Sequence, residues 1–215
     1  MLAKFRKLYG NRKMSWLTVI LFAVATGIYT GIIMLIPALK DTSFQDIGVN
    51  LEWWVIFAVF IVVNCQKNWE AMLKCFIFFL ISQPLVYLVE VVFGPLSIGM
   101  AIYYYRIIWF RWTIAVLPGA FIAFYCKKQD LLGAFILGFG NAIQLILGLT
   151  YIVKCISDFP HHGLSALVSI ASVFIMNFSI QKQKRYCAAS LAVALVITVL
   201  VIIVAALTGR LHLSM

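Results

Sequence analysis

Charged side chains are scarce in this sequence. They make up 11% of the 215 residues, against 64% hydrophobic residues, and the mean hydropathy is +1.04. Soluble globular chains are typically about 25% charged and about 45–50% apolar, whereas apolar runs of about 20 residues are typical of membrane spans. The composition therefore excludes a water-soluble domain. It predicts an all-α, polytopic integral membrane protein, which we expect in the plasma membrane.

Catalytic and cofactor motifs are lacking as well. The sequence holds no HExxH, GxSxG, CxxC or Walker motif. Its cysteines form no cluster at metal-ligand spacing, and two adjacent loop histidines, His161 and His162 beside Asp158, usually neither bind a metal nor sense pH. We therefore expect no enzyme, no cofactor and no metal site. Any ATP-driven activity would need an ATPase or other membrane partner subunit.

Acidic residues are the rarest charged class, with 7 Asp and Glu against 17 Lys and Arg, so the formal net charge is +10. In a soluble protein such an excess indicates nucleic-acid binding. In a membrane protein it is explained by the enrichment of Lys and Arg in cytoplasmic connections. We expect the lipid bilayer as a partner, and no nucleic acid.

Seven apolar runs predict seven transmembrane helices in one bundle domain over residues 1–215. The first run follows a basic segment, 1–14, and is longer than the 7–15-residue core of a signal peptide, so we expect it to be retained. Six or eight helices are the alternatives, because the second run is short and the stretch 95–105 is apolar enough to re-enter the membrane. The runs cover residues 16–38, 51–66, 75–93, 107–126, 131–153, 164–180 and 187–208.

The distribution of basic residues predicts the orientation. If the N-terminus is cytoplasmic and the seven helices alternate, 12 of the 17 basic residues fall in cytoplasmic segments, and each inner connection is more basic than the outer one beside it. The C-terminus then lies outside. Four cysteines lie at the cytoplasmic ends, where they stay reduced, and acylation is weakly indicated at Cys126 and Cys187.

Small residues at helical spacing predict which helices pack closely, since transmembrane helices associate through small side chains. Runs one, four, five and six carry such seams, so we expect them to form the packed centre. The seventh run is almost wholly aliphatic, which predicts a peripheral position. The seams include Ala23, Gly27 and Gly31; Ala115, Gly119 and Ala123; Gly133, Gly140, Gln144 and Gly148; and Ser165, Ser169, Ser172 and Ser179.

Two ionisable residues within the runs are the first candidates for a functional site. Glu90 and Arg111 lie near the outer ends of the third and fourth helices, and each costs about 2.5–3.5 kcal/mol at a helix centre on insertion scales. We expect them at similar depth, either as a structural clamp or as part of an outward-facing pocket. Both interpretations stay open. The residues that would extend the pocket are Arg106, Glu52, Gln83, Tyr87, Asn141 and Gln144.

Two functions fit these features. The first is a transporter, or the membrane-embedded binding subunit of one, for a small solute or amphiphile. Paired opposite charges and the polar face of the fifth helix favour it. The alternative is a non-catalytic accessory, assembly or immunity protein that acts through helix contacts, which the scarcity of charge at the bilayer centre favours.

Overall fold

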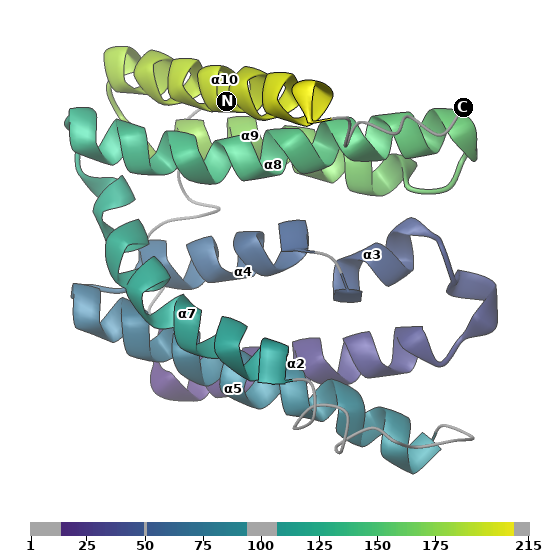
Figure 1. The fold of residues 1–215 in the computed structure, drawn as a ribbon. Coiled ribbons are helices and arrows are strands. Elements are labelled where there is room, and N and C mark those ends of the chain that lie inside the picture. The colour runs from purple at the N-terminus through teal and green to yellow at the C-terminus, as the bar shows by residue number, and fades with distance from the viewer. Residues whose placement is uncertain (1–13, 50, 94–106, 209–215) are drawn as a thin grey trace. The chain divides into compact units, whose positions relative to one another are not determined.

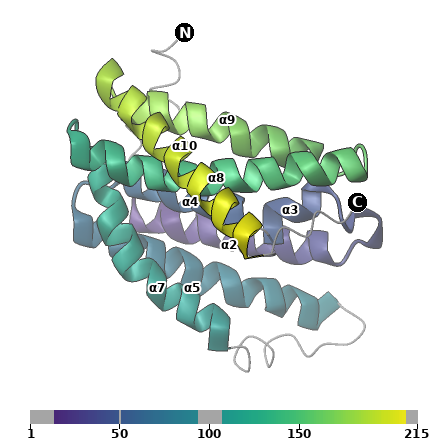
Figure 2. The ribbon, with the colours of Figure 1, turned by 45° about the horizontal axis from the view of Figure 1, so that its top comes forward.

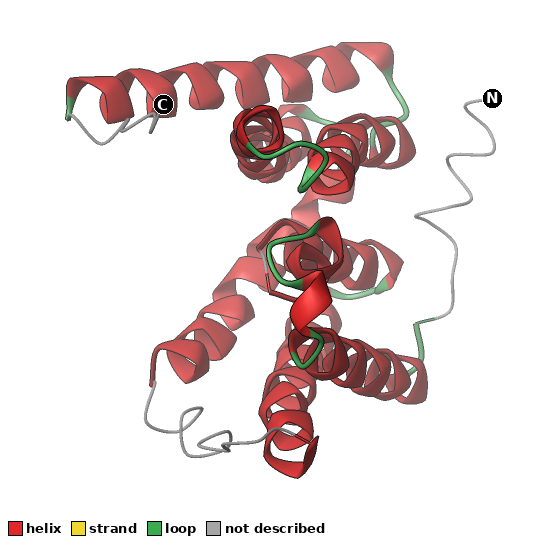
Figure 3. Ribbon diagram, turned by 90° about the vertical axis from the view of Figure 1, so that its right-hand side faces the viewer, coloured by secondary structure: helices red, strands yellow, loops and turns green. Residues whose placement is uncertain are grey.

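The computed structural model describes residues 14–49, 51–93 and 107–208, and every regular element in that part of the chain is a helix (Figure 3). Five helices are long and apolar enough to cross a membrane, which suggests a membrane protein. They are α2 (Trp16–Met34), the stretch Asn68–Glu90 of α5 (Asn68–Phe93), α8 (Leu131–Ser157), α9 (Gly163–Ile180) and α10 (Lys184–Leu207).

The other two expected spans are shorter helices. At 1.5 Å per residue, the 14 residues of α4 (Leu51–Asn64) reach about 21 Å, less than the hydrocarbon thickness of about 30 Å. Helix α7 (Ile107–Ala123) has 17 residues and continues into a short 3-10 helix, η2 (Phe124–Lys127). The count of seven spans and the orientation of the termini therefore stay predictions.

The chain divides into two compact units, each described by itself. The N-terminal unit, Asn11–Phe124, contains α2, η1 (Pro37–Leu39), α3 (Ser43–Val49), α4, α5 and α7. The C-terminal unit, which includes Tyr125–Met215, contains α8, α9 and α10 (Figure 1). The single bundle domain over residues 1–215 stays a prediction.

Helix α5 is the centre of the N-terminal unit, because α2, α4 and α7 all pack on it. The α2 seam fits closely: a Cβ built on Gly27 would lie 2.7 Å from the Ser82 carbonyl oxygen, and one on Gly31 2.6 Å from Val89 Cβ. A ring cluster fills the neighbouring core, with Phe22 and Phe78 at 5.0 Å and Trp54 and Phe79 at 5.5 Å between centroids. The seam expected on α7 differs, since a Cβ on Gly119 would meet nothing within 4 Å.

Helix α8 is the centre of the C-terminal unit, with α9 and α10 packed against it. Asp130 begins α8 as its N-cap, accepting a 2.7 Å hydrogen bond from the Gly133 backbone N–H. Helix α10 crosses α8 obliquely (Figure 2). It buries Ser190, Ala194 and Thr198, although its opposite face is exposed as the aliphatic sequence predicts.

Helix α5 begins at Asn68, seven residues before the expected start at 75. Lys74, expected in a cytoplasmic connection, therefore lies inside a helix and is buried. It donates to the Met14 carbonyl oxygen and forms an ion pair with Glu70, four residues earlier. The contact with Met14 ties a residue just before the start of α2 to α5.

Candidate functional site

A row of buried polar side chains runs along the inside of the C-terminal unit, and we call it the polar core. Each of its three helices contributes, and each residue is largely withdrawn from solvent. The members are Asn141 and Gln144 on α8, Ser165, Ser169, Ser172 and Asn177 on α9, and Ser190 and Thr198 on α10.

Glycines on α8 allow the helices to approach closely beside the polar core. A Cβ on Gly138 would lie 2.8 Å from the Ser190 carbonyl oxygen of α10. A Cβ on Gly148 would lie 2.7 Å from Ile170 Cδ1 and 3.3 Å from Ser169 Cβ of α9. Helix α8 therefore contacts α10 at Gly138 and α9 at Gly148. Asn141 and Gln144 lie between these two glycines along α8.

Hydrogen bonds satisfy only part of the polar core. Asn141 Nδ2 donates to Ser190 Oγ at 3.3 Å, and Asn177 Nδ2 donates to the Cys187 carbonyl oxygen at 3.1 Å. The other atom of each amide, Oδ1, is buried and receives no hydrogen bond from the described residues, and Ser169 Oγ has none either. Each of these three buried oxygens therefore has acceptor capacity that the described residues leave unused.

Leaving such acceptors unpaired is costly in a membrane. Transfer of an amide or hydroxyl to an apolar phase without a compensating hydrogen bond costs roughly 2–7 kcal/mol, and the bilayer core offers no water in exchange. By contrast, hydrogen bonds between transmembrane helices contribute about 0.6 kcal/mol on average. The Asn141–Ser190 bond alone does not offset that cost.

Glu90 and Arg111 lie on two helices of the N-terminal unit, α5 and α7. Glu90 is half-buried near the end of α5, and Arg111 is exposed about one turn into α7. Ion pairs among the described side chains include Glu70–Lys74 and Asp158–His161. The structural clamp and the outward-facing pocket therefore both stay predictions.

The other candidate residues are placed as follows. Gln83 and Tyr87 are half-buried on α5, in the same unit as Glu90. Asn141 and Gln144 are fully buried on α8, in the other unit. Arg106 and the side chain of Glu52 lie outside the described residues. A pocket that joins these residues stays a prediction.

Two glutamines that the sequence did not single out connect the two loops at one end of the C-terminal unit. Gln181 Nε2 donates to the carbonyl oxygens of Cys126 and Lys128, at 2.8 and 3.1 Å. Gln129 Nε2 donates to the Ile180 carbonyl oxygen at 3.0 Å, and its Oε1 accepts from the Lys182 backbone N–H at 2.7 Å. We call this pair the glutamine clamp.

The cysteines and histidines add little chemistry. Burial raises the pKa of the Cys126 thiol to about 12, which opposes its acylation. His161 Nδ1 contacts Asp158 at 2.9 Å, and the His162 ring stacks on Tyr151 at 5.7 Å. The described residues include no group of three potential metal ligands.

The chain matches no protein-family model, and no curated protein or solved structure matches it. The residues themselves therefore carry the functional argument.

Proposed function

We propose that this chain is a membrane transporter, or the membrane-embedded binding subunit of one, for a small solute or amphiphile that carries hydrogen-bond donors. The observation that supports this most is the set of unpaired buried acceptors in the polar core, Asn141 Oδ1, Asn177 Oδ1 and Ser169 Oγ. They lie inside a unit whose three helices are all long enough to span a membrane.

The proposal includes the finer topology. Seven spans place the N-terminus in the cytoplasm and the C-terminus outside the plasma membrane, with α4 and α7 completing the set. The excess of Lys and Arg in the inner connections supports this orientation. A reporter fused after Met215 is expected to be active outside the cell, and a cytoplasmic signal would contradict the topology.

A second function, a non-catalytic accessory or assembly protein, is favoured by one specific observation. Two hydroxyls of the polar core bond to their own helix, Ser172 Oγ to the Ser169 carbonyl oxygen at 2.7 Å and Thr198 Oγ1 to the Ala194 carbonyl oxygen at 2.8 Å. Such local bonds satisfy a hydroxyl without any ligand. If the chain is an accessory protein, we expect α8, α9 and α10 to pack fully against one another, with no space for a ligand.

Thiol accessibility distinguishes the two functions. In a cysteine-free background, Ser169→Cys and Ser172→Cys are treated in membranes with a small, charged methanethiosulfonate reagent. Phe174→Cys is the matched control, because Phe174 lies at a similar depth of α9 but on its exposed apolar face. The cysteine thiolate, which forms only where water reaches, attacks the reagent, forms a mixed disulfide and displaces methanesulfinate.

We expect both serine positions to react much faster than Phe174→Cys, because a solute route is hydrated. Equal, slow reaction at all three positions in folded protein would contradict the transport proposal and favour the accessory function. Testing two serine positions keeps the experiment decisive if one variant fails to fold.

A further inference from the structure

The glutamine clamp joins two segments that are rich in basic residues and lie about 50 residues apart in the sequence. One segment, 125–130, leads into the start of α8, and the other, 181–186, contains the α9–α10 connection and the first residues of α10. The clamp bonds the Lys128 carbonyl oxygen to Gln181 and the Lys182 backbone N–H to Gln129. The backbones on either side of these contacts are therefore held beside each other.

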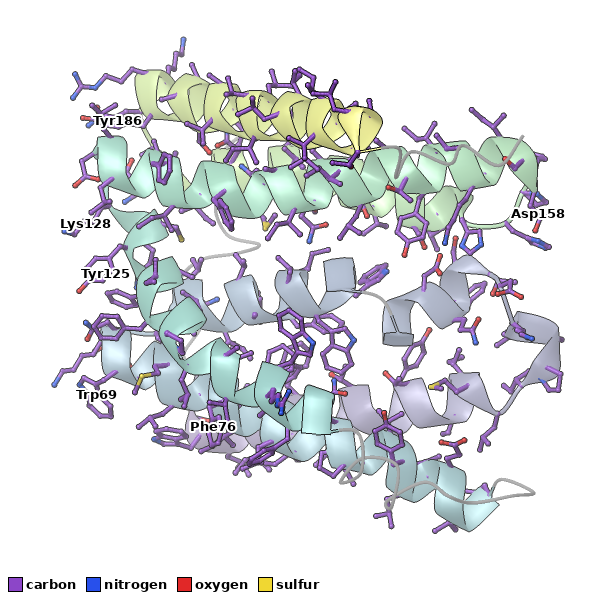
Figure 4. All side chains as sticks on the ribbon, in the orientation of Figure 1. Trp69, Phe76, Tyr125, Lys128, Asp158 and Tyr186 are labelled. Carbon is purple, nitrogen blue, oxygen red and sulfur yellow. The ribbon has the colours of Figure 1, made fainter. Side chains whose placement is uncertain are left out.

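Five cations and one carboxylate lie on these two segments. Lys128, Lys182, Lys184 and Arg185 are exposed and Lys127 is half-buried. The carboxylate, Asp130, caps α8 through the Gly133 backbone N–H. Figure 4 shows Lys128 at the end of the unit opposite Asp158. We call these five cations the basic rim.

Two tyrosines support cations of the basic rim. The Arg185 guanidinium lies 4.4 Å from the centroid of the Tyr186 ring and donates to the Tyr186 hydroxyl. The Lys128 ammonium lies 4.9 Å from the centroid of the Tyr125 ring. Tyrosines are enriched at the membrane–water interface, where one end of the side chain is apolar and the other is wet. Cations beside tyrosines at the ends of apolar helices are the side chains that suit the headgroup level of a membrane.

We propose that the basic rim binds the phosphate of an anionic phospholipid. Lysine and arginine donate charge-assisted hydrogen bonds to phosphate oxygens, and basic clusters next to membrane helices attract anionic headgroups. The glutamine clamp distinguishes this site from a loose set of surface lysines, because it holds the backbones that carry Lys128 and Lys182 beside each other. The inference goes beyond the proposed function, since a lipid site would exist whether or not the chain transports a solute.

Lipid retention by the intact, detergent-purified chain tests the proposal. Native mass spectrometry counts bound phosphatidylglycerol and phosphatidylcholine in wild type and in the triple variant Lys128→Gln, Lys182→Gln, Arg185→Gln. The matched control removes three exposed lysines elsewhere, Lys40→Gln, Lys67→Gln and Lys154→Gln, so the net charge changes by the same amount. Inorganic phosphate is added as a competitor in a separate arm.

We expect the rim variant to retain phosphatidylglycerol about tenfold less than wild type, while the control variant retains it normally. Gln129→Ala, which changes no charge, is expected to weaken retention as well, because the loops separate. Unchanged retention in the rim variant, or equal loss in the control, would overturn the lipid site. Displacement of lipid by millimolar inorganic phosphate would assign the rim to a soluble anion instead.

Discussion

The crossing of α2 and α5 leaves no room for a side chain at Gly27. A Cβ there would lie 2.7 Å from the Ser82 carbonyl oxygen and 2.9 Å from Leu85 Cβ, whereas ordinary contact begins at 3.4 Å. The Ser82 oxygen belongs to the α5 backbone and cannot rotate away. Gly27→Ala therefore forces the two helices apart by several tenths of an ångström.

The expected cost is that of overpacking, about 1–3 kcal/mol. Alanine also favours a helix over glycine by about 0.8–1.0 kcal/mol, so the substitution needs a control that shares this gain. Gly140→Ala provides it, because a Cβ on Gly140 would meet nothing within 4 Å. The difference between the two variants isolates the helix crossing.

The free energy of unfolding is measured in mixed micelles with increasing dodecyl sulfate, followed by tryptophan fluorescence. We expect Gly27→Ala to be about 2 kcal/mol less stable than Gly140→Ala, which corresponds to a Tm about 4–8 °C lower. If Gly27→Ala were at least as stable as Gly140→Ala, the close packing of α2 on α5 would be refuted.

Three further predictions follow from the described contacts. Lys74→Met removes the donor to the buried Met14 carbonyl oxygen and the cation that pairs with Glu70, so it should destabilise the chain by about 1–3 kcal/mol. The exposed Lys67→Met should cost under about 0.5 kcal/mol in the same unfolding assay. Cys126 should resist maleimide at pH 8 until the chain is denatured, because its raised pKa keeps the buried thiol protonated; labelling of the folded protein would contradict this. A double-mutant cycle of Glu90→Gln and Arg111→Gln should give a coupling free energy within about 0.5 kcal/mol of zero. A larger favourable coupling would indicate an ion pair between Glu90 and Arg111.

The helical class could be predicted from the sequence because it follows from composition alone. Long apolar runs require backbone hydrogen bonds to be satisfied within each segment. The expected starts at residues 107 and 131 agree with α7 and α8. The start of α5 could not be predicted, because Asn68–Lys74 is polar enough to resemble a loop and is held in the helix by its ion pair and by the contact with Met14.

The packing partners were harder to predict than the helices. Small-residue spacing shows that a helix has a seam, but not which helix meets it. Gly27 and Gly31 face α5, which was not among the four helices expected at the centre. Gly119 shares the same kind of spacing and yet faces open space.

Some residues of the candidate site were found from the sequence, whereas the contacts between distant segments were not. Asn141 and Gln144 were predicted from their shared helix face, and both are buried. The glutamine clamp depends on contacts between segments about 50 residues apart, which spacing alone does not reveal. For Glu90 and Arg111 the sequence predicts similar depth in the membrane, but depth alone does not fix the rotation of each helix about its axis, so pairing stays a prediction.

The most direct test of the proposed binding function is an experimental structure of the chain in lipid, resolved well enough to show water and small ligands. We expect non-protein density within hydrogen-bond distance of Asn141 Oδ1 and Ser169 Oγ, about 2.7–3.2 Å away. A polar core filled only by its own side chains, with both atoms bonded to neighbouring helices, would contradict it.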